Sequence, residues 1–433
     1  MVNQDFKNIV IIGASGAGHA LVNELISTLP GGYRILLVDA LEYSFFPVAA
    51  LRAAVVPGWE EKVVLPLKTS TVFPFGSIHK VIAPNKVIEL KKDSIILEKP
   101  FEGSTEISFY KAIIATGSIQ PSPMRPSGDW RDINDYLKAL RKSQEEIKRA
   151  ESVVIVGGGT VGVEFAGEVR ALYPSKSITL IHNRSTLLTP LTESQPDGNK
   201  EIPNSYISPP THLKLAKSLT QLVKKQNINL ILDDKVIIPS EESNSTISNS
   251  NSDSEEWNGS FGSQDSLRDI RTENGQVVKG DYIFLSIGNK PNSHLVQIAD
   301  KDAVESKTGL VKVDKYLKVQ SDILGHEDYY AIGDVSNVPG LKTLYLAFLQ
   351  AKSAAVNLVN EINRKPLVAY NPGTFGGLFV PFGPELGAAS ITIPYLGTWT
   401  VGSGMVSKVK GKKLLLDKWV GSWKGEEKVE IPI

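Results

Sequence analysis

Apolar residues follow the order strand, glycine turn, helix, strand twice along the chain. In the first copy, an apolar run at residues 8–12 stops at a turn, residues 13–18, and apolar residues then recur at helical spacing. A second apolar run at residues 35–38 ends at Asp39 and completes a βαβ unit. The second copy has a strand at 153–156, a turn at 157–162 and a strand at 178–181. This spacing predicts a duplication on the scale of a domain.

The two turns carry the chemistry of a dinucleotide site. Such a turn needs a glycine for the tight bend, a second where the backbone meets the pyrophosphate, and a third where the helix packs on the strand. The second turn supplies them as Gly157, Gly159 and Gly162. The first turn has serine at the middle position, and its expected binding residues are Gly13, Ala14, Ser15, Gly16, Ala17 and Gly18. One such turn also arises from tight strand–helix packing, but two at domain spacing predict two dinucleotide sites.

The residue after the second strand separates the two sites. Asp39 stands where an acceptor for a ribose 2′-hydroxyl belongs, so the first fold is expected to hold FAD. The corresponding stretch of the second fold, His182-Asn183-Arg184, has no carboxylate and includes a cation. A 2′-phosphate is therefore tolerated there, and either NADH or NADPH is expected as the second ligand.

Composition excludes several other classes of protein. The 433 residues contain 47 Lys and Arg against 47 Asp and Glu, so no nucleic-acid partner is expected. Cysteine is absent, which excludes disulfides, thiolate zinc sites, iron–sulfur clusters and dithiol redox pairs. The six histidines are scattered, so no metal site is expected. The first strand begins too early for a secretory leader, no apolar run reaches membrane-spanning length, and Val2 excludes N-myristoylation, so we expect a cytoplasmic protein.

The pattern predicts an α/β protein with two Rossmann-like domains and a small C-terminal α+β piece. Residues 1–121 are expected to form the first part of the FAD domain. Residues 122–287 are expected to form the NAD(P)H domain, after prolines that break regular structure. Within it, residues 240–265 are mostly Ser, Asn, Asp, Glu and Gly, which predicts a disordered surface loop. Residues 364–433 form the C-terminal piece.

These motifs resemble the two-dinucleotide-fold flavoprotein reductases, and among them the apoptosis-inducing-factor-like proteins of the ferroptosis-suppressor type with their fungal relatives. Ala115-Thr-Gly117 resembles the family turn near the flavin, which implies flavin contacts for Thr116 and Gly117. Tyr330-Ala-Ile-Gly-Asp334 resembles the second FAD motif, whose Asp binds the ribityl chain. This resemblance implies that residues 288–363 complete the FAD domain. The resemblance also implies an FAD contact for Arg52 and a backbone contact to adenine for Ile78.

A further resemblance concerns the helix after the second turn. Gly162-Val-Glu164-Phe-Ala-Gly-Glu168 is similar to these proteins and to type II NADH dehydrogenases, in which the first Glu lies near the meeting point of nicotinamide and flavin. The resemblance therefore implies a catalytic role for Glu164. The stretch at residues 365–373 is also similar, although Asn371 stands where a Lys can occur.

Without cysteine no dithiol can collect electrons, so an external acceptor is expected to take them. The resemblance implies a quinone such as ubiquinone, FAD in plain or modified form, and a location in the cytoplasm or on the periphery of mitochondria or lipid droplets. Two alternatives stay open: a redox-linked signalling flavoprotein of cell death with slow turnover, and a reductase of a protein electron carrier. For residues 375–399, rich in Gly, Pro and aromatics, we favour core packing or a homodimer contact over a quinone entry or a membrane contact.

Overall fold

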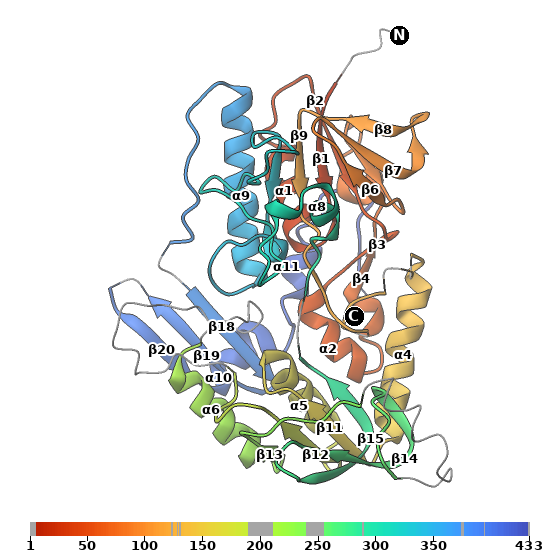
Figure 1. Ribbon diagram of the computed structural model, residues 1–433, viewed down its shortest axis with the longest axis vertical. Coiled ribbons are helices and arrows are strands. Elements are labelled where there is room, and N and C mark those ends of the chain that lie inside the picture. The colour runs from red at the N-terminus through yellow and green to blue at the C-terminus, as the bar shows by residue number, and fades with distance from the viewer. Residues whose placement is uncertain are drawn as a thin grey trace.

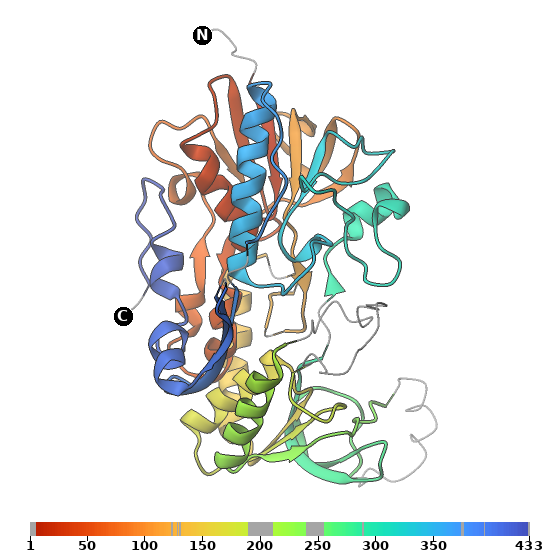
Figure 2. The same cartoon turned by 90° about the vertical axis from the view of Figure 1, so that its left-hand side faces the viewer.

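The protein consists of two sheet-containing halves with a third, smaller sheet beside them (Figure 1). The computed structural model describes residues 6–122, 124–127, 129, 131–188, 211–239, 255–287, 290–373, 376–393 and 395–431. Figure 2, turned by 90°, shows the halves one above the other, with the long helix α9 (Leu344–Ile362) running along the upper half.

The upper half contains a parallel sheet in the order β17-β9-β1-β2-β5. Its central strand β1 (Lys7–Ile12) pairs with β2 (Tyr33–Val38) and with β9 (Lys111–Ile114), and α1 (Gly16–Ile26) connects β1 to β2. The edge strand β17 (Tyr329–Ala331) comes from a much later part of the chain and pairs with β9. The predicted discontinuity of the FAD domain is therefore confirmed.

The other elements of this half surround that sheet. They are β3 (Tyr43–Phe45), α2 (Pro47–Val55), η1 (Glu60–Val63), β4 (Val64–Pro66), α3 (Thr69–Val72), β6 (Val87–Leu90), β7 (Ser94–Phe101), β8 (Ser104–Ser108) and β10 (Ser118–Ile119). The sheet's own edge strand β5 (Lys80–Ile82) pairs with β2. The later segment adds β16 (Lys290–Pro291), α8 (His294–Ala299), η2 (Lys301–Ala303) and η3 (Gly333–Val335).

The lower half contains the second βαβ unit. Its sheet has the order β13-β12-β11-β15-β14, parallel except for the β14–β15 pair. The elements are α4 (Ile133–Arg149), β11 (Ser152–Val156), α5 (Thr160–Leu172), β12 (Ser177–Ile181), α6 (Leu213–Lys225), β13 (Asn229–Ile231), β14 (Gly262–Arg271) and β15 (Val277–Leu285). Both predicted strand–turn–helix–strand units are present.

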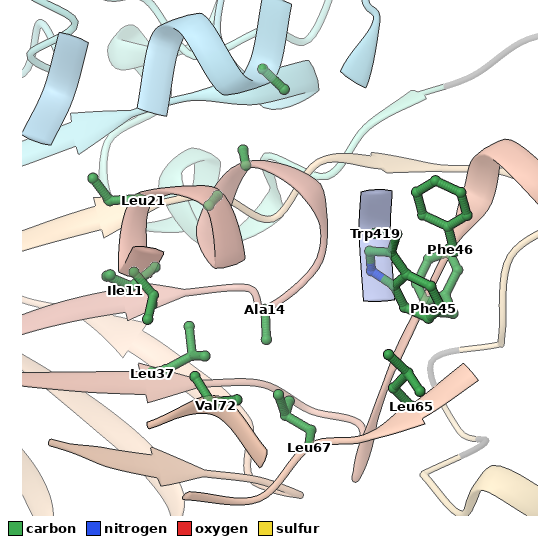
Figure 3. Close-up of a cluster of buried hydrophobic side chains, with 14 of the residues drawn as sticks. Ile11, Ala14, Leu21, Leu37, Phe45, Phe46, Leu65, Leu67, Val72 and Trp419 are labelled. Atoms are coloured by element: carbon green, nitrogen blue, oxygen red, sulfur yellow. The ribbon is translucent and has the colours of Figure 1, made fainter. Parts of the chain in front are cut away.

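The C-terminal piece joins the two halves. Its antiparallel sheet has the order β18-β19-β20 and packs on α5 and α6 of the lower half. Its elements are β18 (Gly376–Phe382), β19 (Leu386–Ile393), β20 (Gly397–Val401), α10 (Ser403–Val406), the π-helical turn η4 (Ser407–Gly411) and α11 (Leu416–Val420). Figure 3 shows Trp419 of α11 among the upper-half side chains Phe45 and Phe46, and the rings of Trp419 and Phe46 stack at 4.9 Å. The domain boundaries themselves stay predictions.

The predicted disordered loop at residues 240–265 is wrong over its second part. Residues 240–254 lie outside the described residues, but 255–265 are ordered and β14 begins at Gly262. Trp257 is buried in a cluster with Val236, Ile270 and Ile283, and its indole N–H donates to Ser260 O at 2.6 Å. One aromatic anchor therefore orders a segment whose average composition is polar.

The helices and the C-terminal stretch bear on the question of membrane contact. Among the helices in the described ranges, none combines the length and the apolar character required to cross a bilayer. The C-terminal stretch divides between core and surface: Val380 and Phe382 are buried against α5, while Leu396 and Trp399 are exposed. Peripheral membrane contact and a homodimer stay predictions.

Candidate functional site: two dinucleotide turns

The first turn has a backbone that only glycine fits. Gly13 has φ +105°, and a Cβ there would lie 2.5 Å from Ala115 O. A Cβ on Gly18 would lie 1.8 Å from Gly13 O, because α1 starts directly against β1. Ser15 is the N-cap of α1, yet its side chain does not cap the helix and donates instead to Phe45 O at 3.3 Å. The N-terminal N–H groups of α1 are thus available to an anion.

Asp39, at the end of β2, holds this turn in place. Its Oδ2 accepts a hydrogen bond from Ala14 N–H at 2.7 Å, and its Oδ1 accepts one from Leu41 N–H at 2.9 Å. Burial raises the pKa of the Asp39 carboxyl, and these two bonds act in the opposite direction. The carboxylate therefore lies beside the turn, where the sequence predicts the ribose of FAD.

The later flavin motifs meet the first turn in space. A Cβ on Gly333 would lie 2.9 Å from the Ala17 side chain of α1. Asp334 accepts a hydrogen bond from Ser118 Oγ at 3.1 Å, directly after the turn that contains Gly117 at φ +70°. Thr116 Oγ1 donates to Asn292 O at 2.6 Å, and Asn292 N–H donates to Gly117 O at 2.9 Å.

Two residues that were predicted to contact FAD, Ile78 and Arg52, have other neighbours in the structure. Ile78 is 40 % exposed, and its neighbour His79 accepts a hydrogen bond from Ile35 N–H of β2 at 3.1 Å. Arg52 is 3 % exposed and forms a bidentate ion pair with Glu168 of α5, with distances of 2.7 and 2.8 Å. Its third hydrogen bond goes to Lys412 O at 3.0 Å. Arg52 thus ties α2, α5 and the C-terminal piece together, and its contact with FAD stays a prediction.

The second turn repeats the first. Gly157 has φ +113°, and a Cβ there would lie 3.0 Å from Ser286 O, while a Cβ on Gly162 would lie 2.1 Å from Gly157 O. Gly159 is the N-cap of α5, with no side-chain cap and nothing within 4 Å of an added Cβ. This turn again offers free helix N–H groups and open space at the middle glycine.

His182 takes the place of Asp39 in the second fold. Its Nδ1 accepts a hydrogen bond from Gly158 N–H at 3.1 Å, and its Nε2 lies 3.2 Å from Leu188 O. Burial lowers the pKa of His182, and the charge of Arg184 lowers it further. Arg184 is exposed and forms no ion pair with any residue in the described ranges.

Glu164 lies on α5, two residues after Gly162, the last glycine of the second turn. Its Oε1 accepts a hydrogen bond from Lys410 Nζ at 2.9 Å, and the same ammonium donates to Phe379 O at 3.1 Å. Burial raises the pKa of Glu164, and Lys410 acts against that rise. The side chains of Glu164 and Lys410 are 13 % and 18 % exposed, so the pair is largely withdrawn from water.

Sequence reasoning missed three charged residues of this site. Lys410 comes from η4, 246 residues after its partner Glu164, and no local pattern indicates that pairing. Glu168 belongs to the quoted α5 motif, and its spacing of one helical turn from Glu164 was the available signal. Lys342 follows the second FAD motif and donates to Ser336 O and Val338 O; burial lowers its pKa to about 8, and Asp334 opposes that shift.

These residues fit the two dinucleotides that the sequence predicts. Each turn leads into a helix of more than ten residues whose N-terminus has no side-chain cap, which is the arrangement that binds a pyrophosphate. At the first turn, Asp39 supplies a ribose acceptor. Thr116 follows β9 and Asp334 follows β17, so both lie at the edge of the sheet where its parallel strands end. FAD would therefore be held by the upper half and the nicotinamide coenzyme by the lower half.

Comparison with known proteins identifies the family of the chain. The family model of pyridine nucleotide-disulphide oxidoreductases matches residues 7–199 and 204–351. Ferroptosis suppressor protein 1 of Xenopus laevis is 30% identical over 432 residues, 97% of this chain and 96% of that protein. The FAD-dependent oxidoreductase FVFD30 of Flammulina velutipes is 26% identical over 362 residues, 82% of this chain and 94% of that protein.

The sulfide:quinone oxidoreductase structure from Aquifex aeolicus shares the fold, with a TM-score of 0.67 at 17% identity over 96% of this chain and 90% of that one. The predicted resemblance to ferroptosis-suppressor-type proteins is confirmed by the full-length similarity. The chain therefore belongs to the pyridine nucleotide-disulphide oxidoreductase family.

Proposed function

We propose that the chain oxidises NADH or NADPH with bound FAD and passes the electrons to an external quinone. The observation that carries this proposal is the pair of equivalent turns, each with an uncapped helix N-terminus, in a chain that has no cysteine. Two dinucleotides can then be held face to face, while no thiol on the chain can receive their electrons. The resemblance to the ferroptosis-suppressor type favours a quinone as the acceptor.

FAD, when bound, supplies the redox chemistry, by exchanging a hydride with the coenzyme and electrons with the acceptor. The chain supplies binding and orientation through its two turns. It also places the Glu164–Lys410 pair on α5, directly after the second turn. Reduction of a quinone to a quinol takes up two protons, and Lys410 Nζ and the raised-pKa carboxyl of Glu164 are the groups in this pair that can hold one.

The test is anaerobic reduction of the FAD-loaded protein, followed by reoxidation. NADH or NADPH is expected to bleach the flavin absorbance. Ubiquinone analogues with tails of different length are then expected to restore the absorbance at a rate no slower than steady-state turnover. If neither coenzyme bleaches the flavin, the proposal is wrong. If the flavin is bleached but only a cytochrome or ferredoxin restores it, the acceptor is a protein carrier instead.

The Asp334→Ala variant tests the flavin site in the same preparation. Asp334 is expected to bind the ribityl chain, so this variant should be purified without flavin. Ser118→Ala removes the hydrogen-bond donor to Asp334 and serves as the matched control, which should keep flavin. Stoichiometric flavin in the Asp334→Ala protein would show that Asp334 is not required to bind the ribityl chain of FAD.

A further inference from the structure

The side chain that follows the second strand performs the same backbone task in both folds. Asp39 accepts from Ala14 N–H at 2.7 Å, and His182 accepts from Gly158 N–H at 3.1 Å. Each donor is the second residue of its glycine turn. The two positions are therefore structurally equivalent, and their remaining hydrogen-bonding capacity can be compared directly.

Asp39 has capacity left for a ligand. A carboxylate offers about four acceptor positions. The N–H groups of Ala14 and Leu41 occupy one on each oxygen, and the N–H of Ala40 and the charge of Arg125 also act on the carboxylate. The remaining lone pairs can accept from ribose hydroxyls, as the ribose of FAD requires.

His182 has no hydrogen-bonding capacity left for a ligand. Because Nδ1 accepts from Gly158 N–H, the proton of the neutral ring is on Nε2, and Nε2–H donates to the carbonyl Leu188 O at 3.2 Å. A neutral imidazole has a single donor and a single acceptor, so both are used by the backbone. The lowered pKa of His182 is in keeping with this neutral tautomer. The residue positions the turn but cannot accept from a ribose hydroxyl.

The charge beside His182 is positive. Arg184 is exposed, follows His182 by two residues, and has no ion-pair partner in the described ranges. Its carbonyl accepts from Asp233 N–H at 3.0 Å, so Asp233 is the carboxylate that faces this position from the end of β13. Asp233 is exposed and raises the pKa of His182, while Arg184 lowers it. Asp234 is not available, because it is buried and bonded to Lys235, Asn274 and Gln276.

We infer that the second fold reads the adenosine 2′ position through Arg184 and binds a 2′-phosphorylated nicotinamide coenzyme in preference to the unphosphorylated one. A guanidinium binds a phosphate through charge-assisted, bidentate hydrogen bonds, whereas a plain ribose finds no free acceptor on His182. The inference rests on the proposed function only for the role of that coenzyme as reductant.

The binding test needs no turnover. The oxidised, FAD-loaded protein is titrated calorimetrically with adenosine 2′,5′-bisphosphate and with AMP, the adenosine halves of the two coenzymes. The parent is expected to bind the bisphosphate about 10-fold or more tightly, since hydrogen bonds to charged groups are the stronger ones. Arg184→Ala should abolish that preference and leave the Kd of AMP unchanged. Lys225→Ala, which removes an exposed cation at the end of α6 of the same half, should keep the preference.

Equal binding of the two nucleotides by the parent, or equal weakening of both in Arg184→Ala, would overturn the inference. Asp233→Asn tests the competing carboxylate: a large loss of AMP affinity in that variant would show that Asp233 reads the ribose, which also overturns it. FAD content, measured in each variant, identifies any that fails to fold.

A second pair of variants tests the role of His182. The carboxylate introduced by His182→Asp would keep an acceptor for Gly158 N–H and add free lone pairs and a negative charge, so the preference should invert toward AMP. His182→Asn keeps the acceptor without the charge and should preserve the preference for the bisphosphate. Identical shifts in both variants would contradict the inference. Nucleotide preference is measured by binding, without reduction of the flavin. A protein that prefers the bisphosphate but whose flavin is not bleached by either coenzyme would therefore contradict the proposed function and not this inference.

Discussion

The two glycine turns have nearly the same backbone and different side chains. Gly13 and Gly157 have φ values of +105° and +113°, and in both turns the third glycine abuts the carbonyl of the first. The second residue differs, and it differs together with the strand-end residue. Ala14 accompanies Asp39, whereas Gly158 accompanies His182, because a Cβ on residue 158 would lie 2.7 Å from His182 Cγ. Turn and strand end are therefore matched to each other in each fold.

The helices after the turns differ as well. The buried residues of α1 are apolar or small apart from His19, and α1 packs against α9 within its own half. Helix α5 packs against α2 and β18, which belong to other parts of the molecule. It carries Glu164 and Glu168 one turn apart, each paired with a cation from elsewhere in the chain. The first helix therefore packs mainly within its own half, apart from the contact of His19 with Trp423 of the C-terminal piece, whereas the second joins three parts of the protein through two ion pairs.

The largest loss of stability is expected at a position where both turns have a glycine, namely Gly18 in the first turn and Gly162 in the second. In Gly18→Ala the new methyl would lie 1.8 Å from a backbone carbonyl, so the fold should lose at least about 3 kcal/mol and the protein should lack FAD. In Gly159→Ala the methyl meets nothing within 4 Å, so the free energy of unfolding should change by less than about 1 kcal/mol. Thermal unfolding and flavin absorbance measure both. A Gly18→Ala protein with parental Tm and full flavin would contradict this reading of the turn.

The next largest effect concerns the ion pair that α5 has and α1 lacks. Arg52→Met would leave Glu168 buried without a partner, which costs about 3–5 kcal/mol. The double variant Arg52→Met with Glu168→Leu should recover most of that loss, because no charge remains buried. Chemical denaturation of the two proteins measures the difference. If the double variant is as unstable as the single one, the ion pair is not the source of the loss.

A third effect uses the single buried titratable residue of α1. His19 is 4 % exposed and stacks on Trp423 at 4.5 Å, and burial lowers its pKa to about 4. The unfolded chain binds a proton near pH 6.5, whereas the folded one does not until about pH 4, so stability falls as the pH falls between these values, by about 3 kcal/mol. The equivalent residue of α5 is Val163.

His19→Val gives the first helix the residue of the second and should remove that pH dependence. The Tm of parent and variant, measured from about pH 7 to about pH 4.5, is the readout, and the difference in slope is what matters, since the variant also loses the contact with Trp423. Parallel slopes would show that other groups cause the acid sensitivity.

The sequence predicts the local units of this fold and much less of their junctions. Strand, glycine turn and helix are encoded within about thirty residues, so β1, α1 and β2 and their second copy could be found from periodicity. The return of residues 288–363 to the first domain was expected only from the family resemblance. The pairing of β17 with β9 and the contact of Gly333 with Ala17 were not predicted. The order of residues 255–265 was missed because one buried residue, Trp257, outweighs a polar composition.

Site residues divide in the same way. Asp39 and His182 were found because their place is fixed by the βαβ unit itself. Lys410 could not be found, because its contact with Glu164 depends on how the C-terminal piece packs on α5. Arg52 shows the opposite risk: its motif implied a flavin contact, while in the structure its charge is matched by Glu168.

The smallest expected effect separates Glu164 from Glu168 on the same helix. Glu164→Gln should keep FAD and slow flavin reduction about 10- to 100-fold, if the ionised carboxylate is the active form. Lys410→Met removes the cation that opposes the burial of Glu164, so the pKa of Glu164 should rise further and more of the carboxyl should be protonated at a given pH. Stopped-flow reduction of Lys410→Met should therefore be slower than that of the parent and recover as the pH rises, whereas Glu164→Gln should stay slow at every pH. A Lys410→Met protein with no recovery at high pH would mean that the ammonium itself, and not the ionisation of Glu164, is what the reaction requires.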